Sequence, residues 1–231
     1  MKIENILAII GVIIGLPSFL LLFCSGQQVI ALLVLIIISF LFYYYLQENL
    51  TPSFHLISHY KKVEIFDKSG SKAKVTLRRR IRPNHRGLQE YIFRYIRSDG
   101  RIENFQSNFG PPHKIARDAG NYVVTIRFPK ELKKKKPLEV TLSYDILEGY
   151  SQNIETTSLF IDYPAKELWM EVIFPDERPC LEAEAYRITG SDEKEIKKPE
   201  ISPDHTEIKW NLKKNFGFFA RGYMYKIEWE W

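Results

Sequence analysis

The strongest chemical signal in the sequence is a stretch rich in arginine, KVTLRRRIRPNHRG, from Lys74 to Gly87. In an extended strand alternate side chains share a face, so arginines at alternate positions point together, away from the apolar ones. Arginines at alternate positions are about 6.6–7 Å apart, close to the distance between successive phosphates of a nucleic-acid strand. Each guanidinium group can bind a phosphate through two parallel hydrogen bonds. The pattern therefore predicts a phosphate-binding face. Its apolar positions are Val75, Leu77 and Ile81, and its ligand-binding candidates are Arg78, Arg80 and Arg82, with His85 and Arg86 in the following turn.

A second basic and aromatic segment follows. Arg94 and Arg97 lie among Tyr91, Phe93 and Tyr95, and aromatic rings beside arginines form the stacking surfaces that single-stranded nucleic acid uses. We add Arg94 to the candidate phosphate ligands. Two alternatives stay open: a charged edge strand that prevents aggregation, and electrostatic attraction to anionic lipid.

No constellation for catalysis is present. The chain lacks a glycine-rich phosphate loop, a paired-cysteine metal motif and a Gly-x-Ser-x-Gly elbow. His55 and His59 stand one helical turn apart, but no further zinc ligands lie nearby; an interfacial helix is the favoured interpretation. Cys180 opens an expected strand and is interpreted as a small buried hydrophobic residue. We expect no enzyme activity, no cofactor and no metal.

The elements that would position these residues are short strands from Lys61 onward. Apolar and polar residues alternate with period two, and turn residues separate the runs. About nine or ten strands at this spacing predict an all-β antiparallel domain, either an immunoglobulin-like sandwich or a barrel. Besides the two basic segments, the expected strands are 122–128, 138–144, 157–163, 168–174, 180–188, 206–212 and 223–231.

The N-terminal part differs sharply, because two runs there, 6–24 and 29–46, contain no charged residue and no histidine. Each run approaches the ~20 residues that a transmembrane helix needs. The sequence therefore predicts a helical hairpin over 1–47, a juxtamembrane connector over 48–60 with room for a short helix, and a β-rich ligand-sensing domain over 61–231.

Small and polar residues within the expected hairpin suit helix packing or a pore. Gly11 and Gly15 have the small-xxx-small spacing that lets helices approach closely. The remaining candidates for a pore lining are Ser18, Gln27, Gln28, Ser39 and Tyr43. Since two helices cannot enclose a conduit, a pore would require a homo-oligomer, for example a tetramer.

Charge predicts the orientation. The 33 Lys and Arg residues exceed the 28 Asp and Glu residues, for a net charge of +5. Basic residues are absent from the hairpin turn and frequent after it, so the positive-inside rule places both termini in the cytoplasm of a multi-pass inner-membrane protein. A basic domain favours anionic partners: nucleotides, nucleic acid or the lipid bilayer.

This layout resembles the two-helix, β-strand-rich membrane effectors that accompany nucleotidyltransferases in bacterial anti-phage defence, of the CBASS and Hailong types. The resemblance implies that the β domain senses a cyclic nucleotide or a short DNA oligomer made by the partner enzyme, and that the helices form a pore. The Gly-x-Trp entry of the small-barrel branch is missing, since the tryptophans are Trp169, Trp210, Trp229 and Trp231.

Together these observations predict an oligomeric membrane effector or ion channel of antiviral defence, gated by a nucleotide. One alternative is a passive membrane anchor whose β domain docks a partner enzyme. Another is a lipid-surface sensor that uses Lys61, Lys62 and the lysine run 133–136.

Overall fold

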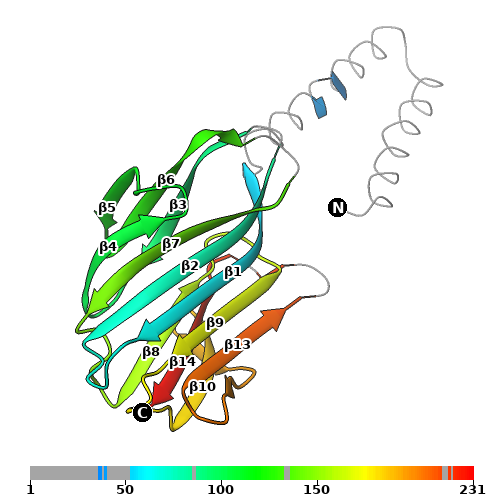
Figure 1. Ribbon diagram of the computed structural model, residues 1–231. Helices are drawn as coiled ribbons and strands as arrows, with labels where there is room; N and C mark the ends of the chain where they lie inside the picture. The colour runs from blue at the N-terminus through cyan, green and yellow to red at the C-terminus, as the bar shows by residue number, and fades with distance from the viewer. Residues whose placement is uncertain are drawn as a thin grey trace, which may run out of the picture. The chain divides into compact units, whose positions relative to one another are not determined.

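The computed structural model describes residues 36–37, 39–40, 53–84, 87–132, 136–214, 218–219 and 221–231. The chain divides into two compact units, Met1–Pro52 and Ser53–Trp231. In the first unit, residues 36–37 and 39–40 are helical. The second unit is built of β-strands (Figure 1).

The described strands form three sheets of seven, four and three strands. Sheet A has the order β12-β13-β9-β1-β2-β7-β4, sheet B the order β3-β6-β5 and sheet C the order β11-β10-β14-β8. All neighbours pair antiparallel except β1 and β9, which are parallel. The strands are β1 (Phe54–Ile65), β2 (Lys72–Pro83), β3 (Leu88–Ile96), β4 (Arg101–Ser107), β5 (Lys114–Asp118), β6 (Asn121–Leu132), β7 (Leu138–Leu147), β8 (Ile154–Phe160), β9 (Glu167–Ile173), β10 (Glu182–Thr189), β11 (Asp192–Glu195), β12 (Glu200–Ile201), β13 (Glu207–Lys213) and β14 (Met224–Glu230).

Sheet A is one layer, and sheets B and C together cover one of its faces (Figure 1). Aromatic contacts join the layers at both ends. Phe54 of β1 lies 5.1 Å from Tyr91 of β3, between ring centroids. Trp210 of β13 lies 5.7 Å from Tyr225 of β14. The second layer of this sandwich is therefore split, and a seam runs between β3 of sheet B and β8 of sheet C.

Strict alternation explains how the strands face the core. In β2 every second residue from Ala73 to Pro83 is buried, and the intervening ones are not. β7, β9 and β14 show the same pattern. Each apolar side chain removed from water contributes about 1.5–3 kcal/mol, so this periodicity fixes which face of sheet A points inward.

The turn between β1 and β2 depends on a carboxylate and a glycine. Asp67 accepts hydrogen bonds from the backbone amides of Ser69, Ser71 and Lys72, at 3.0, 3.0 and 2.9 Å. Gly70 has a φ of +66°, and a Cβ added there would lie 1.5 Å from the Tyr150 carbonyl oxygen. Only glycine permits this approach of the chain to the β7–β8 loop.

The predicted fold class was wrong in its helical half. The described residues of the second unit form an all-β structure, and among all described residues no helix has the length and apolarity to cross a bilayer. The spans predicted at about 6–24 and 29–46 lie outside the described residues, apart from 36–37 and 39–40.

Other expectations also change. Residues 54–60, predicted as connector, form the first half of β1. The three sheets keep separate edges, so the domain is a split sandwich and not a closed barrel. Short strands β4, β5, β11 and β12 lie in segments without a clear period-two pattern, and sequence reasoning missed them.

The glycine requirement of the β1–β2 turn can be tested by paired substitutions. We expect Gly70→Ala to lower the free energy of unfolding by at least about 2 kcal/mol, because it adds backbone strain and a steric overlap. Gly190→Ala is the control, since Gly190 has a φ of +59° with nothing within 4 Å of the added Cβ. Urea denaturation of both variants measures the difference, and equal losses would contradict the overlap.

Candidate functional site

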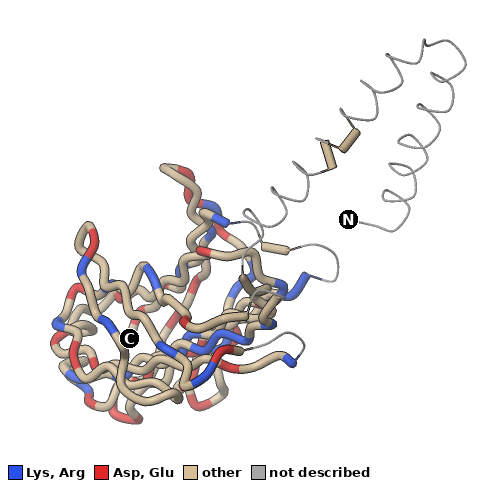
Figure 2. Tube along the Cα trace, turned by 90° about the horizontal axis from the view of Figure 1, so that it is seen from above, with Lys and Arg blue, Asp and Glu red and all other residues tan. Residues whose placement is uncertain are grey.

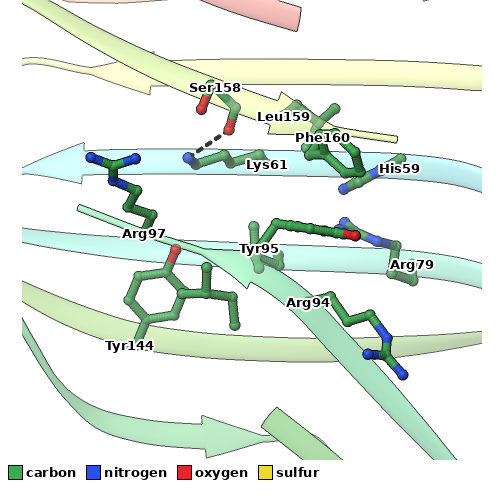
Figure 3. Close-up of a pocket in the computed structure, with 12 residues that line it drawn as sticks. His59, Lys61, Arg79, Arg94, Tyr95, Arg97, Tyr144, Ser158, Leu159 and Phe160 are labelled. Atoms are coloured by element: carbon green, nitrogen blue, oxygen red, sulfur yellow. Dashed lines mark hydrogen bonds between the residues drawn. The ribbon is translucent and has the colours of Figure 1, made fainter. Parts of the chain in front are cut away.

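A small cavity lies where the seam between β3 and β8 meets sheet A. Strands β1, β2 and β7 supply its floor, and β3 and β8 supply its walls (Figure 3). The floor side chains are buried, whereas several wall residues on β3 and β8 are exposed, so the cavity opens along the seam. Its lining consists of His59, Lys61, Leu77, Arg79, Arg94, Tyr95, Ile96, Arg97, Tyr144, Ser158, Leu159 and Phe160.

The lining is strongly basic. Lys61 and Arg79 come from the floor, Arg94 comes from β3 and Arg97 from the residue that follows β3, and His59 lies two residues before Lys61 on β1. No Asp or Glu belongs to the lining. In the view of Figure 3, Lys61 and Arg97 lie toward one end and Arg79 and Arg94 toward the other.

Burial disfavours charge on the floor groups. Lys61 is 8% exposed, and its Nζ donates a hydrogen bond of 2.9 Å to the Ser158 carbonyl oxygen. Burial, aided by the nearby Arg79 charge, lowers the pKa of Lys61 to about 8. Burial, followed by the charges of Arg79 and Lys61, holds the pKa of His59 well below its usual value, so His59 is neutral at pH 7.

Arg79 is a buried cation with few hydrogen-bond partners. It is 4% exposed, and its Nε and Nη1 atoms have no hydrogen-bond partner among the described residues. Its guanidinium lies 5.4 Å from the Phe93 ring centroid. Burial lowers the pKa of Arg79, although the guanidinium still holds its proton at neutral pH.

Other buried polar atoms in this region also lack partners among the described residues: both ring nitrogens of His59, the Tyr91 hydroxyl and Oδ1 of Asp162. A buried donor left without an acceptor costs about 1–3 kcal/mol, and such groups gather at functional sites or around unseen water and ions. The unsatisfied donors here are Nε and Nη1 of Arg79, the Tyr91 hydroxyl and one ring nitrogen of neutral His59, whereas Oδ1 of Asp162 is an unsatisfied acceptor.

A buried carboxylate, Asp162, interacts with two of these cations. It is 7% exposed and lies two residues after the end of β8. Burial raises its pKa, whereas the charges of Arg79 and Arg94 act in the opposite direction. Asp162 thus offsets part of the positive charge of Arg79 and Arg94.

The mouth of the cavity is shaped by an irregularity in β3. The β3–β6 register shifts between Phe93 and Ile96, and Tyr95 has a φ of 58°. A bulge of this kind redirects a side chain. The Tyr95 ring is 48% exposed and lies 4.1 Å from the Phe160 ring, between centroids, so these two rings join sheets B and C across the seam.

The cavity volume of about 30 Å³ limits what can enter. A water molecule needs about 10–15 Å³ on this measure, so the interior holds about two waters. A sugar or base ring does not fit, whereas the oxygen atoms of a single anionic group do.

The arginines predicted at alternate positions of β2 share the opposite, outer face of sheet A. Arg78 lies over the Tyr60 ring at 4.1 Å, and Arg80 and Arg82 are exposed. Glu139 of β7 stands directly opposite Arg80. Basic and acidic positions are interspersed over most of the Cα trace in Figure 2, and on the outer face the exposed Glu139 pairs with Arg80 in the β2–β7 register.

Arg94 does not join that face. It comes from sheet B and lines the cavity with Arg79, so the structure separates Arg94 from Arg78, Arg80 and Arg82. His85 and Arg86 lie outside the described residues. So do the expected pore residues Gly11, Gly15, Ser18, Gln27, Gln28 and Tyr43, whereas Ser39 is described and helical.

Four basic lining residues were not among the predicted phosphate ligands: Arg79, which was given no role, and His59, Lys61 and Arg97, which were considered for a metal, for lipid and for base stacking. Arg79 carried a usable signal, because it occupies an inward position between Leu77 and Ile81 on β2. A charged residue at a core position is costly unless it serves a purpose. The other three required knowledge of which strands meet at the seam.

The two histidines considered for a metal site are separated by the fold. The β1–β2 register shifts between Leu56 and Ser58, and as a result His55 is exposed while His59 is buried. Within the part of the chain that the structure describes, no group of three or more metal-ligating side chains is present.

Comparison with known proteins gives little further information. No protein-family model and no curated protein matches this chain. Crystal structures of an M1 zinc metallopeptidase from Deinococcus radiodurans align with 76% of this chain and 42% of that chain, at 8% identity and a TM-score of 0.41. A two-domain M1 zinc metallopeptidase mutant bound to L-arginine aligns with 77% of this chain and 43% of its own, at 9% identity and the same TM-score. The chain therefore spans less than half of these proteins, and such a likeness does not establish a shared activity.

The depressed pKa of Lys61 predicts an unusual pH dependence of stability. The unfolded chain keeps this proton up to about pH 10.5, whereas the folded chain releases it near pH 8. Between these values unfolding takes up a proton, so raising the pH stabilises the fold. Relative to Lys61→Met, we expect wild type to gain about 2 kcal/mol between pH 7 and pH 9.5. Denaturation at both pH values measures this, and parallel profiles for the two proteins would show that Lys61 titrates normally.

Proposed function

We propose that the β domain is a non-catalytic sensory module that binds an anionic ligand, the phosphate of a nucleotide, in the cavity between β3 and β8. The observation that carries the proposal is the buried Arg79, whose Nε and Nη1 atoms have no partner among the described residues. A phosphate oxygen would accept from these donors and replace the water that they lose on folding.

Charge around the cavity supports an anion over a neutral ligand. Four cations, Lys61, Arg79, Arg94 and Arg97, face a lining without carboxylates. Charges in a partly buried site are screened less by salt than charges on an open surface. The outer arginines of β2 lack this advantage, because Glu139 opposes Arg80 and solvent surrounds both.

The position of the cavity suits a sensor. Its lining joins all three sheets, and only side chains connect sheets B and C there. An anion bound between Arg79 of sheet A and Arg94 of sheet B would hold these layers in one arrangement. A ligand shifts a conformational equilibrium only through different affinity for the two states, and an anion that bridges the seam would have higher affinity for the state in which Arg79 and Arg94 are close.

This proposal retains the nucleotide-sensing half of the family resemblance. A pore, a homo-oligomer, a location in the inner membrane and a role in anti-phage defence stay predictions. The residues expected to build the pore lie almost wholly outside those described.

Two neighbouring arginines on β2 provide a matched test. Arg79 faces the cavity and Arg80 the outer surface. We expect Arg79→Met to abolish the stabilisation of the folded domain by inorganic phosphate or a mononucleotide, and Arg80→Met to preserve it. For wild type, ligand at about 100 times its Kd should add about 2.7 kcal/mol to the free energy of unfolding. Isothermal titration calorimetry and denaturation with ligand measure both quantities.

Stability without ligand provides the control for folding. Arg79→Met removes an unsatisfied buried charge but also takes a cation away from the buried Asp162, and these effects oppose one another, so we expect the ligand-free domain to stay within about 3 kcal/mol of wild type. Loss of binding by a variant that folds well would assign the effect to the cavity. If phosphate and nucleotides leave wild type unchanged, water fills the cavity and the proposal fails; if Arg80→Met alone loses binding, the site is the outer face.

A further inference from the structure

We infer that the cavity receives a terminal phosphate monoester end-on, so that the module recognises the phosphorylated end of a linear nucleotide in preference to a cyclic dinucleotide or an internal phosphodiester. This inference rests on the proposed function and specifies its ligand.

The first argument is size. An interior of about 30 Å³ has room for about two oxygen atoms of one phosphate, with the rest of the group at the mouth, but for no ring. A terminal monoester has three unesterified oxygens and a single carbon substituent, which can leave by the mouth. In a phosphodiester two bridging oxygens carry carbon chains, and both would have to leave through the same seam. A cyclic dinucleotide encloses each phosphate between two sugars and meets this obstacle at both phosphates.

The second argument is charge. With Lys61 protonated, the four cations and the single carboxylate of Asp162 leave an excess of three positive charges. A phosphate monoester carries about −1.5 to −2 at pH 7, whereas a diester carries a single negative charge. Because the floor cations are buried, each unit of uncompensated charge there is costly. The doubly charged monoester neutralises more of this positive charge than a singly charged diester does.

The third argument is the arrangement of the mouth. Arg94, Tyr95 and Arg97 line the cavity and are exposed. The Tyr95 ring is held against Phe160 and still has 48% of its surface free. A base of the terminal nucleotide can stack on this ring, while Arg94 and Arg97 are available to the next phosphate. Recognition of the end and of the adjoining chain thus uses different residues.

The phosphate monoester is also the chemistry of a glycerol phosphate headgroup. Tyr95 favours a nucleotide over such a headgroup, because a base can stack on its exposed ring and glycerol has no ring to stack. The experiment therefore includes glycerol 3-phosphate as a separate probe.

The test compares probes that differ only at the end, by calorimetry at pH 7 with the full chain. The probes are a linear trinucleotide with a 5′ phosphate, the same trinucleotide without it, the same with the phosphate capped as a methyl ester, a cyclic dinucleotide, and glycerol 3-phosphate. We expect the uncapped 5′ phosphate to bind at least about tenfold more tightly than every other probe, the effect of one or more charge-assisted hydrogen bonds.

Two substitutions assign the preference to the cavity. Arg79→Met should remove the difference between capped and uncapped phosphate, and Arg80→Met should keep it. Tyr95→Leu should reduce the advantage of the trinucleotide over glycerol 3-phosphate without changing the preference for the uncapped end.

The outcomes separate this inference from the proposed function. If the cyclic dinucleotide or the methyl ester binds as tightly as the uncapped probe and still depends on Arg79, the cavity senses nucleotides but not ends, and this inference fails alone. If glycerol 3-phosphate binds most tightly, the ligand is a headgroup phosphate. If no probe binds in an Arg79-dependent manner, the proposed function fails as well.

Discussion

The structure depends on one costly arrangement: basic side chains buried inside a β-sandwich. Lys61 and Arg79 point inward from the central strands of sheet A, next to the neutral His59. Lys61 donates to the Ser158 carbonyl oxygen, whereas Nε and Nη1 of Arg79 have no hydrogen-bond partner among the described residues. Replacing such groups by apolar residues would often stabilise a protein, so their presence indicates a purpose other than stability.

The split second layer makes this arrangement possible. A continuous sheet over sheet A would cover Arg79 completely, whereas sheets B and C leave a seam at which β3 and β8 meet through side chains. Under the proposed function, the seam would admit an anion to groups that a continuous core would exclude. The proposed binding site is thus a consequence of the split in the second layer.

Much of the fold follows from local patterns in the sequence. Alternation predicts most strands, including β2, β6, β7, β9 and β14, because burial of one sheet face imposes a period of two. It also places Arg78, Arg80 and Arg82 together on the outer face, as the structure has them. The small strands β11 and β12 carry few inward residues, and no local pattern marks them.

The sequence by itself determined that the domain is all-β, basic and without recognisable catalytic motifs, since these properties depend on composition and on short-range periodicity. Tertiary structure decided which basic residues meet. Two register shifts, in β1 before His59 and in β3 around Tyr95, reverse the alternation at the cavity. A shift of one residue moves every later side chain to the other face. No local pattern shows where such shifts occur, because cross-strand partners from distant parts of the chain determine them.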